Sequence, residues 1–286
     1  MPVLEKLSSN RVSTGWLTKY KFPSTSLGGL DTQFNIFVPF SSGSSVPVLF
    51  YLAGLTCNED TGAQKGGFLN AAGKEGIAVV FPDTSPRGAG VEGEDDDWQL
   101  GTGAGFYINA TAEKWKKHYN MYDLMVKELP AVLKEADLGL DFSRWSLFGH
   151  SMGGHGALSI YLKNPGLFKS ASAFAPICNP AVVPWGIGAF SNYLDYKTRS
   201  NPPAEWLQHD SSHLLQNYAA DDLHILVDVG TGDDFLKKGQ LEPGSLERAG
   251  KEGVQVRMQD DYDHSYYFIS TFAPEHIAFH AKFLKA

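Results

Sequence analysis

The sequence predicts an α/β protein with a mostly parallel central sheet and helices on both faces. Short apolar runs rich in β-branched and aromatic residues recur along the chain, and segments with helical spacing separate them. Strands of a parallel sheet are buried on both faces, which explains why these runs are almost wholly apolar. Because the alternation continues without a linker rich in proline or serine, we expect residues 1–286 to form one domain.

The first part of the chain predicts four strands and one helix. The strands are expected near residues 12–20, 34–40, 46–53 and 76–83, and the helix around 63–74. The third strand is mostly apolar and should be central in the sheet. Residues 84–111 are rich in glycine and acidic residues and show no periodicity, which is typical of a long loop that covers or shapes a site.

The second part of the chain continues the alternation. Helices are expected at residues 119–136, at 153–165 and at the C-terminus, and strands at 144–149, 170–177, 223–230 and 254–259. Residues 179–212, which contain Trp185 and Trp206, interrupt this order. We interpret them as an insertion over the C-terminal edge of the sheet.

Composition excludes several classes of protein. The formal net charge is -8 without a basic stripe, so a nucleic-acid partner is not expected. The N-terminal residues lack the apolar core of a signal peptide, and no run approaches the roughly 18 apolar residues of a membrane span. The two cysteines, Cys57 and Cys178, suit a reducing compartment better than a disulfide scaffold, with one disulfide as the less favoured alternative. The simplest interpretation is a cytoplasmic protein.

Ser151 is the candidate nucleophile. It lies in Gly149-His150-Ser151-Met152-Gly153, a G-x-S-x-G pattern between a strand-like and a helix-like run. In this setting a sharp strand-to-helix turn exposes the serine hydroxyl, as in the α/β-hydrolase fold. A merely structural turn is the alternative, and the flanking strand and helix disfavour it.

A serine hydroxyl needs a histidine base, which in this fold follows the serine and the acid along the chain. His264 is the best candidate because it lies between a predicted strand and a predicted helix. His276 and His280 are four residues apart in the C-terminal helix, where a solvated helix face is a better interpretation than a metal pair. His150 and His155, beside the serine, are expected to be packing or helix-surface residues.

The acid is expected in the loop after the strand at 223–230. Asp233 and Asp234 both lie there, and spacing does not separate them. The oxyanion formed by attack on a carbonyl requires two backbone N–H groups. Met152 supplies one, and Leu55 or Thr56 in the loop after the third strand supplies the other.

Six segments resemble the S-formylglutathione hydrolase, or esterase D, family of serine hydrolases. They are "GLTCNED", "FPDTSPRG", "DDDWQLGTGAGFY", "YNMYDLMVKELP", "FGHSMGGHGAL" and "YDHSYYFI", and they span nearly the whole chain. The resemblance implies an α/β-hydrolase fold and hydrolysis of S-formylglutathione to glutathione and formate in formaldehyde detoxification. It also implies a homodimer that needs neither a metal nor an organic cofactor.

The resemblance assigns individual residues. It implies a triad of Ser151, Asp233 and His264, with the amides of Leu55 and Met152 as oxyanion donors. A formyl group is small, so Trp98, Phe106 and Trp185 are candidates for the wall of the acyl pocket, with core packing as the alternative. Cys57 follows the oxyanion loop and is either a pocket residue open to thiol reagents or, slightly favoured, an inert buried thiol.

Two further motifs carry weaker signals. The acidic run at Glu92 and residues 94–97 is interpreted as a solvated loop rather than a cation site, and "GTGAG" at 101–105 lacks the strand and helix of a dinucleotide loop. Two functions compete with thioester hydrolysis: a general carboxylesterase or acyltransferase with the same triad, and a binding module without catalysis.

Overall fold

The computed structural model describes residues 3–40, 45–197, 200–219 and 222–286. Nine strands form one sheet in the order β1-β2-β3-β5-β4-β6-β7-β8-β9. In this order, the neighbours β1, β2, β3 and β5 pair antiparallel, and the pairs from β5 through β4 to β9 are parallel. β4 is the middle strand of the sheet, as predicted for the third strand. The strands are β1 (Glu5–Val12), β2 (Gly15–Ser24), β3 (Leu30–Pro39), β4 (Val46–Leu52), β5 (Ala78–Pro82), β6 (Leu140–His150), β7 (Ala171–Phe174), β8 (Ile225–Gly230) and β9 (Val254–Gln259).

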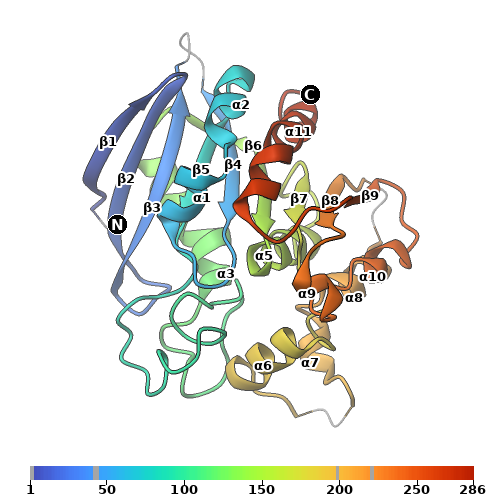
Figure 1. Cartoon of the computed structure of the whole chain (residues 1–286). Helices are drawn as coiled ribbons and strands as arrows, with labels where there is room; N and C mark the ends of the chain where they lie inside the picture. Colours follow the sequence, from blue (N-terminus) through green and yellow to red (C-terminus); the bar gives the residue numbers. More distant parts are fainter. Residues whose placement is uncertain (1–2, 41–44, 198–199, 220–221) are drawn as a thin grey trace.

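Helices cover both faces of the sheet (Figure 1). On β7, Ser172 and Phe174 contact the C-terminal helix α11, whereas a Cβ on Gly154 of α5 would meet the side chain of Ala173. Successive side chains of a strand point to opposite faces, so α5 and α11 lie on opposite faces of the sheet. The helical segments are α1 (Glu59–Lys65), α2 (Phe68–Glu75), α3 (Met121–Asp123), the π-helical turn η1 (Leu124–Glu128), α4 (Leu129–Glu135), α5 (Met152–Lys163), α6 (Pro184–Tyr193), α7 (Ala204–Leu207), α8 (Ser211–Gln216), α9 (Asp234–Lys237), α10 (Gly244–Glu247) and α11 (Tyr266–Leu284).

The structure differs from the predicted elements at two places. Where one strand is expected at 12–20, the structure has the hairpin of β1 and β2. The sequence pattern does not reveal β1, because residues 5–11 are exposed and carry no apolar pattern. The helix expected at 63–74 is divided into α1 and α2, because Gly67 adopts a left-handed conformation with φ of 73°. The insertion expected at 179–212 contains α6, α7 and part of α8, while residues 198–199 lie outside the described residues.

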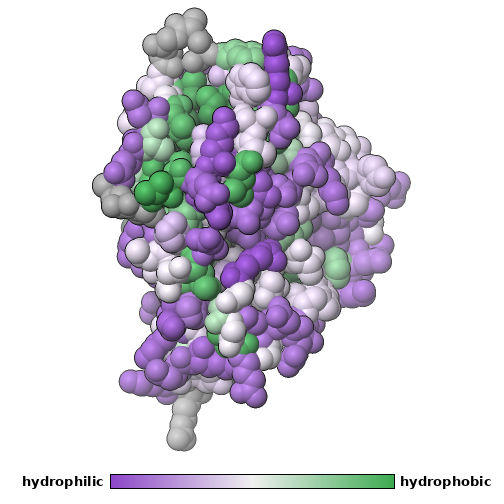
Figure 2. Space-filling model, turned by 90° about the vertical axis from the view of Figure 1, so that its left-hand side faces the viewer, coloured by the Kyte–Doolittle hydropathy of each residue, from purple (hydrophilic) through white to green (hydrophobic). Residues whose placement is uncertain are grey.

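The side of the molecule that carries β1 is mostly hydrophilic, with hydrophobic side chains gathered in its upper part (Figure 2). β1 forms one edge of the sheet and pairs with β2 alone. Its backbone therefore offers unpaired hydrogen-bonding groups along one side. Among the described helices, none is long and apolar enough to cross a membrane.

His276 and His280 of α11 correct the sequence interpretation. Both are fully buried, because α11 packs on β6, β7, β8 and α2 rather than presenting these residues to solvent. His276 is hydrogen-bonded to Ser172 (2.8 Å) and Asp228 (3.1 Å), and His280 is hydrogen-bonded to Ser172 (2.8 Å). The expected solvated helix face is therefore wrong, and the pair belongs to a buried polar network.

Candidate active site

Ser151 occupies the turn between β6 and α5 with φ of 58° and ψ of -118°. L residues rarely adopt a positive φ, so neighbouring contacts must hold this turn. The Ser151 amide donates to the carbonyl of Phe174 (2.9 Å). A Cβ on Gly149 would lie 2.2 Å from the Gly153 carbonyl oxygen, and one on Gly153 would lie 2.0 Å from that of Leu52. The two glycines therefore allow strand and helix to approach closely enough to form the turn.

Asp233 and His264 come from the loops after β8 and β9 and meet directly. The fully buried Asp233 caps α9, where its Oδ1 accepts from the amides of Phe235 (2.7 Å) and Leu236 (3.4 Å). Its Oδ2 lies 2.5 Å from Nδ1 of His264. A carboxylate only accepts hydrogen bonds, so Nδ1 of His264 carries a proton, and in the neutral ring the lone pair therefore lies on Nε2. This is the form in which an imidazole acts as a general base.

Other acidic residues near this loop have different partners. The exposed carboxylate of Asp234 lies 3.6 Å from Nζ of Lys237, and Asp263 accepts from Ser265. Asp228 lies within β8. Burial opposes ionisation of Asp228, but hydrogen bonds from His276 and Arg257 outweigh this effect and lower its pKa to about 2. Of the two aspartates that spacing left open, Asp233 is therefore the one that contacts His264.

Ser151 and His264 line the same cavity, whose volume is about 170 Å³. It lies at the carboxyl edge of the sheet, where loops after successive parallel strands converge. The lining residues are Gly54, Leu55, Thr56, Cys57, Trp98, His150, Ser151, Trp185, Phe235 and His264.

Three of the four predicted pocket residues, Cys57, Trp98 and Trp185, lie in this wall. The rings of Trp98 and Trp185 meet edge to face at 5.9 Å. The structure does not bring Phe106 to the cavity. Phe106 is fully buried and packs beside His155, because its positive φ of 50° turns the end of the long loop into the core.

The loop after β4 passes alongside Ser151. A Cβ on Gly54 would lie 3.2 Å from Cβ of Ser151, so the next amide, that of Leu55, is close to the serine. The amide of Met152 opens α5, where no preceding turn supplies a carbonyl. Within the described part of the chain, neither amide donates a hydrogen bond. Both are therefore available to an oxyanion formed beside Ser151.

Cys57 and Cys178 are free thiols, so the alternative of a disulfide between them is wrong. Cys57 is half-buried, and burial raises the pKa of its thiol although hydrogen bonds with Tyr266 and Thr61 oppose the shift. A raised pKa leaves less of the reactive thiolate at neutral pH.

Like Phe235, His150 is a cavity residue whose place in the site the sequence did not reveal. It is buried, and the centre of its ring lies 4.4 Å from that of His264. Burial and the proximity of His264 hold the pKa of His150 well below its ordinary value, so its ring stays neutral. Its position directly before the nucleophile, at the end of β6, was the available signal.

The acidic run at residues 92–97 is not uniformly solvated. Glu94 is buried, and its carboxylate accepts from the Gly90 amide (2.7 Å) and from the Tyr119 hydroxyl (3.0 Å). This residue therefore ties the long loop to the body of the protein. Among the described residues, no group of three or more histidine, cysteine or acidic side chains is arranged to hold a metal ion.

The fold and the turn at Ser151 define an α/β-hydrolase of the serine esterase class. The Esterase family model matches residues 24–279. S-formylglutathione hydrolases of Mus musculus and Arabidopsis thaliana are 45% and 46% identical to this chain over 287 aligned residues, covering 99% of this chain and 99% and 98% of theirs. A solved S-formylglutathione hydrolase from Agrobacterium tumefaciens superposes with a TM-score of 0.91 at 42% identity, covering 98% of this chain and 99% of that one. The chain belongs to the S-formylglutathione hydrolase family of esterases.

Proposed function

We propose that this protein hydrolyses S-formylglutathione to glutathione and formate, using Ser151 as nucleophile, His264 as base and Asp233 as the orienting acid. The observation that carries the triad is the 2.5 Å contact between Asp233 and His264, with His264 and Ser151 lining one cavity. The printed names of the full-length relatives support the substrate.

The reaction proceeds through an acyl-serine. His264 Nε2 takes the proton of Ser151 Oγ as this oxygen attacks the formyl carbon, and the Leu55 and Met152 amides bind the resulting oxyanion. Collapse breaks the C–S bond, and the leaving thiolate of glutathione takes the proton from His264. Water then loses a proton to His264 as it attacks the formyl-serine, and Ser151 takes that proton as formic acid leaves. The formic acid releases its remaining acidic proton to solvent and becomes formate. Water is the single co-reactant of this sequence.

The cavity supports a small acyl group. Its volume of about 170 Å³ is below the roughly 300 Å³ at which pockets for drug-sized ligands begin. Trp98 and Trp185 line this cavity with bulky side chains, which favours a short acyl chain over a long one. The glutathione portion therefore extends beyond the cavity.

The family resemblance supports four further parts of the proposal: one domain over residues 1–286, a homodimer, a cytoplasmic location and a role in formaldehyde detoxification. The single nine-stranded sheet also supports one domain. Two free thiols suit a reducing compartment. The exposed edge strand β1 is compatible with pairing between subunits. Sedimentation equilibrium tests the homodimer by measuring the mass of the protein in solution.

A comparison of kcat/KM on three substrates tests the proposed function. The kcat/KM for S-formylglutathione should be higher than that for p-nitrophenyl acetate and that for S-formyl-2-mercaptoethanol, because the glutathione portion adds binding energy outside the cavity. Equal rates on the two formyl thioesters would indicate a general thioesterase. Transfer of the acyl group to an added alcohol in preference to water would indicate an acyltransferase.

A further inference from the structure

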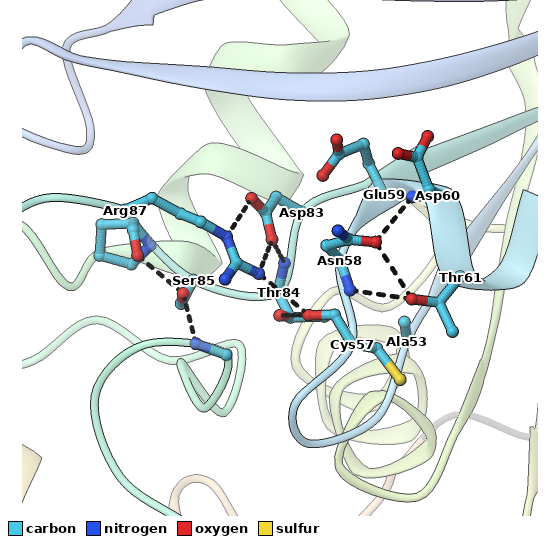
Figure 3. A network of polar contacts seen from close by, with 12 residues as sticks. Ala53, Cys57, Asn58, Glu59, Asp60, Thr61, Asp83, Thr84, Ser85 and Arg87 are labelled. Carbon is cyan, nitrogen blue, oxygen red and sulfur yellow. Dashed lines mark hydrogen bonds and ion pairs between the residues drawn. The ribbon is translucent and has the colours of Figure 1, made fainter. Parts of the chain in front are cut away.

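The segment that follows β5 contains neither the proposed nucleophile nor the proposed base. It nevertheless contacts the loop that carries the Leu55 amide. This segment, "FPDTSPRG", is one of the six that carry the family resemblance. The reaction described above gives it no role. Figure 3 shows Asp83, Thr84, Ser85 and Arg87 of this segment beside Cys57 and the start of α1.

Two side chains converge on the carbonyl oxygen of Cys57. Thr84 Oγ1 donates to it at 2.5 Å, and Nη2 of Arg87 donates to it at 3.1 Å. Arg87 is itself fixed by Asp83, which accepts from Nε at 2.8 Å and from Nη2 at 2.7 Å. Asp83 is buried and also accepts from the Thr84 amide at 2.7 Å. A bidentate arginine held in this way restricts the movement of the carbonyl that it contacts.

A second set of contacts holds Thr56, the residue directly after Leu55. The Thr56 amide donates to the carbonyl of Gly103 (2.9 Å), and the Gly103 amide donates to Oγ of Ser85 (2.8 Å). Thr56 has φ of 65°. This conformation is strained for a residue with a β-branched side chain, and it persists only where surrounding contacts hold it. The segment after β5 thus contacts Cys57 directly and reaches Thr56 through Gly103, so its contacts hold the two residues that follow Leu55.

The far end of the loop is fixed by the start of α1. Asn58 Oδ1 accepts from the Asp60 amide (3.0 Å), while the Asn58 amide donates to Oγ1 of Thr61 (3.1 Å). This reciprocal cap leaves residues 53–57 as a short bridge between β4 and the N-cap of α1. In this bridge, the carbonyl of Cys57 is the backbone group that both Thr84 and Arg87 contact.

We propose that Thr84 and Arg87 are positioning residues that hold the Leu55 amide in place for the oxyanion by fixing the Cys57 carbonyl. The inference rests on the proposed function, because it assigns the Leu55 amide to transition-state stabilisation. An amide that is displaced or mobile binds the developing oxyanion less well, while ground-state binding of the substrate outside the cavity is unaffected. The effect should therefore appear in kcat rather than in KM.

The test uses Thr84→Val and Thr84→Ser with p-nitrophenyl acetate and with methylboronic acid. The boron of this inhibitor bonds to Ser151 Oγ, whose proton passes to His264, and an oxygen of the resulting anionic boronate takes the oxyanion position. Thr84→Val should lower kcat by about 10- to 100-fold with KM nearly unchanged, which is part of the 10²- to 10³-fold cost of losing an oxyanion donor. The Ki of the boronate should rise by a similar factor, and Thr84→Ser, which keeps the hydroxyl, should restore both values.

Arg87→Gln gives an independent test at a more exposed side chain, so the inference does not depend on the folding of one variant. It should lower kcat and weaken boronate binding in the same proportion. Arg144→Gln is the matched control, because Arg144 is also partly exposed and contacts Asp141 at 2.6 Å far from the cavity. This control should keep wild-type kinetics and boronate affinity whatever its melting temperature.

Unchanged kcat and Ki in folded Thr84→Val or Arg87→Gln would overturn the inference. A fall in kcat without weaker boronate binding would also overturn it, because the loss would then lie outside oxyanion stabilisation. The proposed function stands or falls separately, since it is measured by hydrolysis of S-formylglutathione in the wild type and in Ser151→Ala.

Discussion

The carboxylate of Asp233 binds the amides of Phe235 and Leu236 with one oxygen and Nδ1 of His264 with the other. The cap of α9 therefore orients the Asp233 carboxylate, and this carboxylate in turn orients the imidazole of His264. Asp234, one residue further on, lies on the outside of α9. Two adjacent carboxylates thus have different surroundings.

This relationship predicts opposite outcomes for two adjacent substitutions. Asp233→Asn should lower kcat by about 10⁴-fold, because an amide in place of the carboxylate favours the wrong tautomer of His264. Asp234→Asn removes an exposed ion pair and should change kcat by no more than about twofold. Steady-state assays of both proteins decide the assignment, and a severe loss in Asp234→Asn alone would show that the acid has been misidentified.

The two tryptophans in the cavity wall predict the acyl-chain preference. Trp98→Ala should raise the rate on a butyryl ester relative to an acetyl ester by about 10-fold or more, because removing the indole makes room for the methylenes that the wild-type wall excludes. Trp16→Ala is the matched control, since Trp16 on β2 is 45% exposed and Trp98 is 49% exposed. An unchanged butyryl-to-acetyl ratio in Trp98→Ala would mean that this residue does not limit the acyl pocket.

The buried histidines predict loss of stability in acid. Burial lowers the pKa values of His150 and His280 well below their ordinary value, so these rings stay neutral in the fold while the unfolded chain binds protons as pH falls below about 6.5. Each such ring removes up to about 1.4 kcal/mol of stability per pH unit below that value. The lowered pKa of Asp228 acts in the same direction at lower pH, since its contribution is present above about 3.8 and is lost as pH falls toward 2.

Melting temperatures measured from pH 7.5 to 5 check this prediction. They should fall with pH, and His280→Asn should reduce the slope because one fewer ring is forced to stay neutral. A melting temperature that is constant or rises toward pH 5 would contradict the assignment of neutral buried rings.

The sequence predicts most of the parallel half of the sheet, because buried strands leave continuous apolar runs. It does not predict β1, since an exposed edge strand needs no apolar pattern. It also misplaces His276 and His280, because four-residue spacing defines a helix face without showing whether that face meets solvent or another element. These burial states depend on tertiary packing.

The candidate site shows the same division. The glycines around Ser151 encode a local turn and can be recognised from the sequence alone. The choice between Asp233 and Asp234 depends on which of them is the buried N-cap of α9, and sequence spacing does not contain that information. The contacts of Thr84 and Arg87 with Cys57 join segments about 30 residues apart and follow from the order of β4 and β5 in the sheet.

Release of glutathione from S-formylglutathione by the wild type and by Ser151→Ala, at equal concentration, tests the central claim most directly. The account predicts rapid turnover by the wild type and a kcat at least about 10⁴-fold lower in a folded Ser151→Ala protein, because the acyl-serine cannot form. Turnover by Ser151→Ala at a rate near that of the wild type, or a wild-type protein that leaves S-formylglutathione intact, would contradict it.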